Sequence, residues 1–282
     1  MTTQLSILEQ LCYSTTRIEC ETFDGQFGTG TGFFFNLLMD GEKSVPTIVT
    51  NRHVAEGMTK GRFRLTKSDI NGNPIKDKHF TLDFSCDFEK MWTFHPDPTV
   101  DLCAMPIGQL LTAASKLNST LFFRTFDKSL IPNQQQLNDL DVVEDILMLG
   151  YPNGIWDAHN NMPIVRKGTT ATHPNIDYNG KREFMIDAAC FPGSSGSPVV
   201  LYNKSGYSTK NGGFNIGGQR IFFLGILYAG PQHTATGELQ VVNVPNLQKA
   251  MTFSRIPNNL GIVIKAERIL DFEEIFKKKY NL

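Results

Sequence analysis

The sequence lacks the features that mark several large classes of protein. Its 27 Lys and Arg residues are balanced by 28 Asp and Glu residues, so no basic excess indicates binding to nucleic acid or to an anionic membrane surface. No apolar run approaches the length of a membrane span. The first residues, Met1–Leu8, contain neither the basic nor the apolar segment of a secretion signal. We therefore expect neither a nucleic-acid partner nor a membrane.

The sequence contains few cysteines, and their number is odd. The five cysteines are Cys12, Cys20, Cys86, Cys103 and Cys190. An odd count without a secretion signal predicts free thiols in a reducing compartment, because disulfides persist mainly in oxidising ones. We therefore expect a cytoplasmic protein.

Motifs for metals and nucleotide cofactors are also missing. The sequence has no His-Glu-x-x-His and no paired Cys-x-x-Cys, which are the common zinc-binding patterns. The glycines Gly28, Gly30 and Gly32 lack the spacing and the strand–helix context of a dinucleotide site. We expect no metal and no cofactor, which argues against a metal-dependent hydrolase.

What the sequence does contain is many short strand-like segments separated by turns. With 282 residues, 40% of them hydrophobic, the chain can bury a sizeable core. The alternating or β-branched segments include Arg17–Glu21, Thr47–Thr50, Phe63–Leu65, Phe80–Phe84, Asp101–Ile107, Asp145–Leu149, Phe184–Ile186, Pro198–Tyr202, Arg220–Leu227 and Leu239–Val244. This pattern predicts an all-β protein, and periodicity alone leaves sandwich and barrel architectures open.

Two segments break the strand pattern. Gly108–Leu117 carries apolar residues at helical spacing, and the tail from Lys265 has an apolar stripe typical of an amphipathic helix. Residues 126–139 and 203–218 are polar and turn-rich, which favours a surface connection and a hairpin loop. The expected organisation has four parts: an N-terminal β unit (residues 1–110), a connector (111–140), a C-terminal β unit (141–260) and a C-terminal helix (261–282).

The strongest chemical signal surrounds Ser195, in Phe191-Pro192-Gly193-Ser194-Ser195-Gly196-Ser197-Pro198. A serine hydroxyl needs a base to become a nucleophile, and donors for the oxyanion that its attack creates. Gly193 lets the backbone bend so that two N–H groups point at one spot. The same residues are also ordinary in a tight turn between strands.

Two further residues could complete such a site. His53 follows the β-branched run Ile48–Thr50, and an imidazole can serve first as base and then as acid. Asp101 lies between apolar neighbours, where a carboxylate is costly to bury unless it is paired, for example with a histidine N–H. Taken singly, His53 could be a structural histidine and Asp101 an exposed strand carboxylate.

Together, His53, Asp101 and Ser195 stand in the chain order of the trypsin-like, or chymotrypsin-fold, serine peptidases, which this sequence resembles. It looks most similar to bacterial single-domain members and to the Deg/HtrA protease domain. The resemblance covers roughly residues 15–250 and extends beyond the three residues. Its further motifs are Gly30-Thr31-Gly32-Phe33, Thr50-Asn51-Arg52-His53, Gly150-Tyr151-Pro152, Gly193–Pro198 and Leu224-Gly225-Ile226, with Asn51 and Arg52 as departures from the family pattern.

The resemblance implies two packed six-stranded antiparallel β-barrels with the site between them, and protein or peptide substrates. It assigns Ser195 as nucleophile, His53 as base and Asp101 as the carboxylate that orients the base, with the N–H groups of Gly193 and Ser195 as oxyanion donors. It places the side chain before the scissile bond in a pocket with two walls, Ala189-Cys190-Phe191 and Tyr228-Ala229-Gly230. Because Ala189 stands where members that cut after Lys or Arg carry an aspartate, we expect a preference for an apolar or small uncharged side chain.

Two other functions compete with this interpretation. An α/β-hydrolase esterase would need the chain order Ser, Asp, His and a helix after its serine, whereas a strand follows Pro198 here. A catalytically gated or inactive scaffold on the protease fold remains open, because fold does not fix function. Some gating by a regulatory partner or ligand is expected, and the polar, turn-rich segments Asp69–Lys78 and Gly154–Asn161 are the candidate gate loops.

Overall fold

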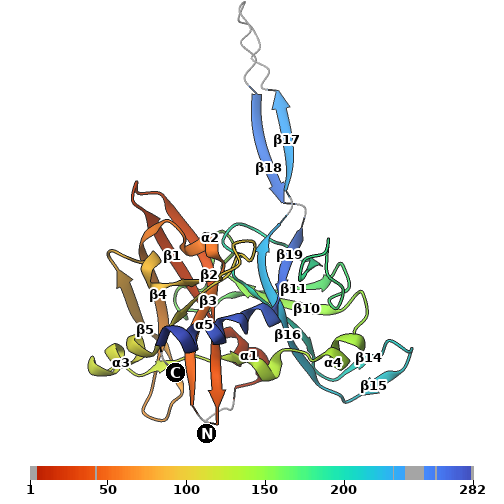
Figure 1. Ribbon diagram of the computed structural model, residues 1–282, viewed down its shortest axis with the longest axis horizontal. Coiled ribbons are helices and arrows are strands. Elements are labelled where there is room, and N and C mark those ends of the chain that lie inside the picture. The colour runs from red at the N-terminus through yellow and green to blue at the C-terminus, as the bar shows by residue number, and fades with distance from the viewer. Residues whose placement is uncertain (1–4, 42, 231, 239–250, 258, 281–282) are drawn as a thin grey trace, which may run out of the picture.

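The computed structural model describes residues 5–41, 43–230, 232–238, 251–257 and 259–280. Strands dominate, and they form two halves that follow each other along the chain (Figure 1). The first half is one sheet and the second is a closed barrel. The expected all-β, chymotrypsin-like fold is thereby confirmed.

The first half is a nine-stranded sheet, where a closed barrel of six strands was expected. Seven strands follow the order β5-β4-β1-β2-β3-β7-β6, while β8 pairs with β4 and β9 runs parallel to β2. The strands are β1 (Thr15–Thr22), β2 (Phe27–Asp40), β3 (Lys43–Thr50), β4 (Met58–Ser68), β5 (Pro74–Phe84), β6 (Thr93–Phe94), β7 (Cys103–Pro106), β8 (Leu121–Phe122) and β9 (Phe126–Asp127). Alternate residues of these strands point inward, among them Ile18, Phe34 and Phe63, and they build an aromatic-rich core.

The second half is a closed six-stranded barrel. Its strand order is β10-β11-β12-β19-β16-β13, and every described pairing is antiparallel. The strands are β10 (Asp145–Gly150), β11 (Ile164–Thr170), β12 (Glu183–Asp187), β13 (Pro198–Asn203), β16 (Arg220–Ala229) and β19 (Leu260–Lys265). The barrel therefore extends to residue 265, because β19 closes it between β12 and β16, and the expected end at residue 260 was too early.

Two hairpins extend from this barrel. β14 (Gly206–Ser208) pairs with β15 (Phe214–Ile216), as expected of a hairpin in residues 203–218. β17 (Gln232–Glu238) pairs with β18 (Met251–Pro257) and projects far from the body (Figure 1). The expected strand Leu239–Val244 lies outside the described residues.

Helices are few and short. The α-helices are α1 (Ile7–Cys12), α2 (Arg52–Ala55), α3 (Gly108–Lys116), α4 (Gln134–Asn138) and α5 (Asp271–Tyr280), and the 3-10 helices are η1 (Glu89–Met91), η2 (Lys128–Leu130), η3 (Pro152–Gly154) and η4 (Ala266–Ile269). Helix α3 matches the expected helix in the connector. Residues 126–139, expected to be a surface connection, contain β9, η2 and α4. Helix α4 forms because Asn133 and Gln136 make a reciprocal capping box. None of the helices in the described ranges is long and apolar enough to cross a membrane.

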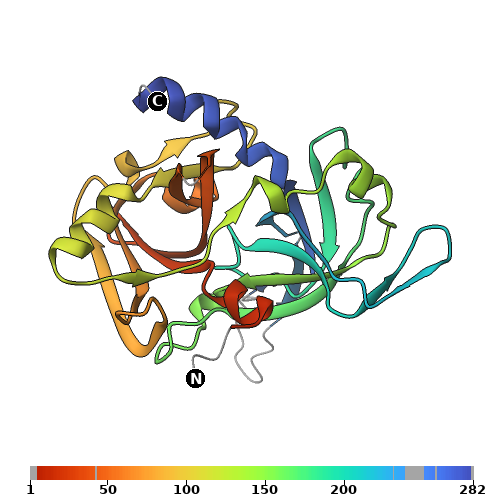
Figure 2. The same ribbon diagram turned by 90° about the horizontal axis from the view of Figure 1, so that it is seen from below.

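The two halves share a continuous core. Phe33 of the first half packs against Phe223 of the second, with ring centroids 5.3 Å apart, and the Phe126 ring stacks on Phe223 at 4.8 Å. The C-terminal helix α5 leaves the barrel and crosses to the first half (Figure 2), where it buries Phe272 and Phe276. Glu273 of α5 also accepts a hydrogen bond from the N–H of Leu38. The tail thus ties the second half back onto the first.

Candidate active site

His53 lies just after strand β3, in the single turn of α2. The extended backbone of Asn51 makes the corner between the two elements. The Asn51 side-chain amide donates to the carbonyl oxygen of Asp101 at 2.9 Å. Asn51, a departure from the family pattern, therefore fastens the segment before His53 to the segment that carries Asp101.

Asp101 holds His53 with both carboxylate oxygens. One oxygen, Oδ1, accepts the main-chain N–H of His53 at 3.0 Å, and Oδ2 lies 2.6 Å from the ring Nδ1. With a proton on Nδ1 the ring has one tautomer and one orientation, and its Nε2 is left able to accept a proton. Asp101 itself precedes β7, which begins at Cys103, so the expected strand Asp101–Ile107 is shorter at both ends.

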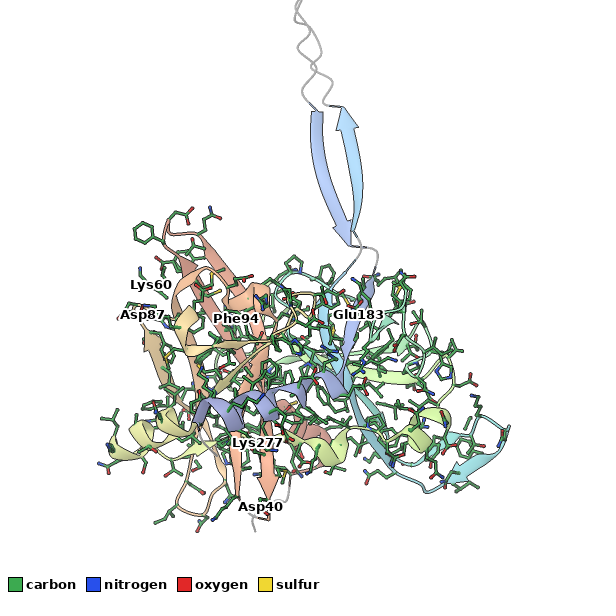
Figure 3. All side chains as sticks on the ribbon, in the orientation of Figure 1. Asp40, Lys60, Asp87, Phe94, Glu183 and Lys277 are labelled. Carbon is green, nitrogen blue, oxygen red and sulfur yellow. The ribbon has the colours of Figure 1, made fainter. Side chains whose placement is uncertain are left out.

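Arg52, the other departure from the family pattern, stabilises the same corner. Its guanidinium Nη2 donates to the carbonyl oxygen of His95 at 2.8 Å, and its Cζ lies 4.9 Å from the ring centroid of Phe94. Phe94 is labelled in the first half in Figure 3. Arg52 therefore connects the turn that carries His53 to the strand segment leading toward Asp101.

The segment before Ser195 is a tight turn. The N–H of Ser194 donates to the carbonyl of Phe191 at 2.9 Å, and Gly193 has φ +86°. Proline at the second position and glycine with positive φ at the third are the signature of a type II turn. Within the described part of the chain, neither the N–H of Gly193 nor that of Ser195 donates to a protein acceptor. Both expected oxyanion donors are therefore free to bind a ligand oxygen.

Thr31 on β2 joins the serine turn to the first half. Its N–H donates to the carbonyl oxygen of Ser195 at 2.9 Å, and its hydroxyl donates to the carbonyl oxygen of Gly193 at 3.0 Å. Its own carbonyl accepts the hydroxyl of Thr50 at 2.7 Å, three residues before His53. Sequence reasoning assigned no role to Thr31, and the only signal for it was its place between Gly30 and Gly32 in a family motif.

Two glycines in the site are required by close backbone approach. A Cβ on Gly196 would lie 1.9 Å from the carbonyl oxygen of Thr31, and one on Gly193 would lie 2.5 Å from that of Tyr151. Gly196 also donates to the carbonyl of Leu227 at 2.8 Å, which fixes Ser195 against the end of β16. The serine turn is thus enclosed between β2, β16 and the Gly150-Tyr151-Pro152 motif.

The structure joins two of the three expected catalytic side chains directly. His53 and Asp101 are in contact, and Ser195 reaches the same corner through Thr31 and Thr50. No hydrogen bond between Ser195 Oγ and His53 occurs among the described residues. In unliganded enzymes such bonds are often long, and they tighten when substrate binds.

The two expected pocket walls approach each other at Gly230 and Cys190. A Cβ on Gly230 would lie 3.7 Å from Cβ of Cys190, and Tyr228 and Ala229 end strand β16 beside Gly230. Burial raises the pKa of the Cys190 thiol to about 11. Burial, followed by the charge of Glu183 (labelled in Figure 3), raises the pKa of Tyr228. Both groups are therefore in their neutral forms at pH 7.

Two residues of the first wall have a partner that sequence reasoning missed. Arg166 on β11 donates from Nη1 to the carbonyl oxygen of Ala189 at 2.7 Å, and its Cζ lies 4.9 Å from the ring centroid of Phe191. The alternation of polar and apolar residues along β11 gave no indication that Arg166 contacts residues more than twenty positions later in the chain.

The two candidate gate loops differ in their packing. In the first, Asp69 accepts the N–H groups of Asn71 and Asn73 and closes a turn that leads into β5. In the second, the Trp156 ring lies near two guanidinium groups, with Cζ of Arg17 at 5.5 Å and Cζ of Arg64 at 5.1 Å from its centroid. This second loop begins beside the serine turn, because Asn153 donates to the carbonyl of Pro192.

The described ranges give little support for a metal site or for disulfide bonds. There, no three His, Cys, Asp or Glu side chains cluster closely enough to hold a metal ion. All five cysteines are described, and each is a free thiol.

Comparison with known proteins adds one strong match. Residues 30–206, more than half of the chain, match the family model described as the trypsin-like peptidase domain. No curated protein matches the chain.

Several solved structures are similar over most of this chain at low sequence identity. The Rv3671c protease from M. tuberculosis, in its active form, is 13% identical over 92% of this chain and 78% of its own, with a TM-score of 0.43. The HtrA-type protease AlgW with tripeptide is 12% identical over 95% of this chain and 62% of its own, with a TM-score of 0.47. A variant of the Tobacco Etch Virus protease is 11% identical over 100% of this chain and 85% of its own, with a TM-score of 0.48.

Proposed function

Because the chain belongs to the trypsin-like peptidase domain family, we propose that it is a serine endopeptidase with Ser195, His53 and Asp101 as its catalytic residues. The observation that carries the proposal is the pair of hydrogen bonds from His53 to Asp101. A carboxylate that takes both the main-chain N–H and the ring Nδ1 fixes the imidazole with Nε2 free. That is the state a general base needs.

The proposed reaction proceeds through an acyl-enzyme. As Oγ of Ser195 attacks the scissile carbonyl carbon, Nε2 of His53 takes the hydroxyl proton, and the carbonyl oxygen becomes an oxyanion. The free N–H groups of Gly193 and Ser195 then stabilise that charge. His53 passes the proton to the leaving amine, and a water molecule activated by the same Nε2 hydrolyses the ester. Asp101 stays ionised and stabilises the imidazolium form of His53.

A gated form of the same enzyme is the second candidate. It is favoured by one observation: among the residues that the structure describes, no hydrogen bond joins Ser195 and His53. A substrate or regulatory partner that moves either side chain slightly would complete the proton path. An inactive scaffold is the limiting case, in which the path is never completed.

The proposal is tested by proteolysis of an unfolded protein substrate, with two matched serine variants. Ser195→Ala removes the proposed nucleophile, whereas Ser194→Ala removes the neighbouring buried hydroxyl, which has no hydrogen-bond partner in the described residues. We expect Ser195→Ala to lower cleavage at least about a thousandfold and Ser194→Ala to retain it. Equal cleavage by wild type and Ser195→Ala would refute the proposal, and a folded wild type that never cleaves would favour the scaffold.

We also propose that the protein works in the cytoplasm, with all five thiols reduced. The support is the odd number of cysteines and their unpaired state. Disulfide-linked products recovered from cells lysed in a thiol-blocking reagent would contradict this location.

A further inference from the structure

Arg166 occupies an unusual place for a charged residue. It stands directly opposite Met148 in the antiparallel pairing of β10 with β11, and Met148 in turn stands opposite Val199 on β13. Residues directly opposite each other on antiparallel strands lie on the same face of the sheet. Because Met148 and Val199 belong to the buried core of the barrel, the side chain of Arg166 starts from the inner face and not from the outer surface.

From this inner face, Arg166 contacts two of the three residues of the first pocket wall, Ala189 and Phe191. Its Nη1 donates to the carbonyl oxygen of Ala189, and its guanidinium lies over the ring of Phe191. Between them, the positive charge of Arg166 lowers the pKa of the Cys190 thiol, against the larger effect of burial. The wall expected to be uncharged therefore has a cation behind it.

The charge of Arg166 has no counter-ion in the described part of the chain. No carboxylate there lies within 4 Å of its guanidinium, although the side chain is only half-exposed, and its Nε is buried without an acceptor. The buried Arg220 of the same barrel is different, since its Nη2 lies 2.5 Å from Oε2 of Glu144. A partly buried cation with an unused donor is costly unless an anion pairs with it.

We infer that Arg166 selects substrates with Asp or Glu immediately before the scissile bond. The inference rests on the proposed endopeptidase function, and it replaces the expected preference for an apolar or small uncharged side chain. A carboxylate entering between the two walls accepts hydrogen bonds from the guanidinium and neutralises its charge, whereas Lys or Arg is repelled. Ala189 leaves room and offers no competing carboxylate.

The test uses four fluorogenic peptides that differ only in the residue before the scissile bond, which is Glu, Gln, Leu or Lys. Glu and Gln have nearly the same shape, so their ratio isolates the charge. On the wild type we expect kcat/KM for the Glu peptide to exceed that for each of the others at least about tenfold, in line with a charge-assisted hydrogen bond. This comparison requires no variant.

Three variants assign the preference to Arg166. Arg166→Gln is expected to lower the ratio of kcat/KM for the Glu peptide to kcat/KM for the Gln peptide at least about tenfold. Arg166→Lys keeps the charge and is expected to restore part of the preference. Lys167→Gln is the matched control, because Lys167 is the exposed neighbour on β11 and pairs with Asp145 on the outside of the barrel.

Labelling with a small fluorophosphonate separates the two possible failures, because such a reagent reports an active serine whatever the pocket prefers. If the wild type is not labelled, the proposed endopeptidase function is wrong. A labelled wild type that cleaves the Gln or Leu peptide as well as the Glu peptide, or leaves the Glu peptide uncut, overturns the role of Arg166. So does an Arg166→Gln variant that is labelled normally and keeps the wild-type preference.

Discussion

The N–H of Thr31 donates to the carbonyl oxygen of Ser195 at 2.9 Å. The residue proposed as nucleophile thus belongs to the second half of the chain but is positioned by the central strand of the first. The same threonine accepts the hydroxyl of Thr50 on its carbonyl, and Thr50 ends the strand that leads to His53. One buried residue therefore sets the distance between the base and the nucleophile.

The first prediction concerns the hydroxyl of Thr31. Thr31→Val keeps the shape and the main-chain bond to Ser195. It removes the hydroxyl bond to Gly193 and also the acceptor of the Tyr151 N–H. We expect a loss of about 1–2 kcal/mol in the free energy of unfolding and a fall in kcat of about tenfold, because the oxyanion turn loses its anchor. Urea denaturation and peptidase kinetics measure the two effects.

Thr47→Val is the matched control for that prediction. Thr47 is fully buried on β3, and its hydroxyl donates only to the carbonyl of Val45, away from the site. A loss of stability that is no larger than that of Thr31→Val, with unchanged kcat, is expected. If both variants lowered kcat equally, the effect of Thr31 would be one of general stability and not of positioning.

A second prediction concerns the conformation of Gly193. Gly193→Ala places a Cβ 2.5 Å from the carbonyl of Tyr151 on a residue with φ +86°, so the turn must rearrange and its N–H must leave the oxyanion position. We expect kcat to fall at least about a hundredfold, comparable to the loss of one oxyanion donor. Gly212→Ala tests the same strain without the site, because Gly212 has φ +80° and open space around it. Activity retained in Gly193→Ala would show that this N–H is not used.

The parts of the fold and of the site that could be predicted are those that depend on local sequence. The Pro-Gly pair makes the turn before Ser195, and the apolar spacing of residues 108–117 makes helix α3, which the structure confirms. Ser6 and Glu9 form a capping box at the start of helix α1. Their spacing is also a local signal, although helix α1 was not predicted. In each case the interaction that forms the element lies within a few residues of it.

The parts that could not be predicted depend on contacts between distant strands. Thr31 and Arg166 both occur in strand patterns that give no indication of a partner, and only barrel closure brings Arg166 to the wall formed by residues 189–191. The nine-stranded sheet was missed for the same reason, since β8 and β9 are two-residue strands that form only where the fold presents an open edge. The proposed role of Arg166 would replace the specificity that Ala189 suggested, and it depends on this same long-range contact.

A third prediction concerns the C-terminal helix. Phe276→Ala removes a fully buried ring that packs where α5 crosses to the first half. We expect a loss of about 3–5 kcal/mol in the free energy of unfolding, the usual cost of emptying a buried aromatic site. Phe214→Ala, at a mostly exposed ring on the β14–β15 hairpin, is expected to change stability by about 0.5 kcal/mol or less. Equal effects in urea denaturation would contradict the docking of α5.

A fourth prediction concerns thiol reactivity and its dependence on pH. The thiolate is the reactive form, and burial raises the pKa of Cys20 and Cys190 to about 11. At pH 8 both thiols are therefore protonated and covered, whereas Cys86 is exposed. We expect iodoacetamide to modify Cys86 first in the folded protein, and Cys20 and Cys190 only near pH 11 or after unfolding. Peptide mapping that finds Cys190 modified fastest at pH 8 would contradict its buried position.

The central claim is that Ser195 is an activated nucleophile, and the most direct measurement is mass spectrometry of the chain after reaction with a fluorophosphonate. The account predicts a single adduct, mapped by fragmentation to Ser195, present in Ser194→Ala and absent from Ser195→Ala and His53→Ala. An adduct on another residue, or equal labelling of wild type and His53→Ala, would contradict it.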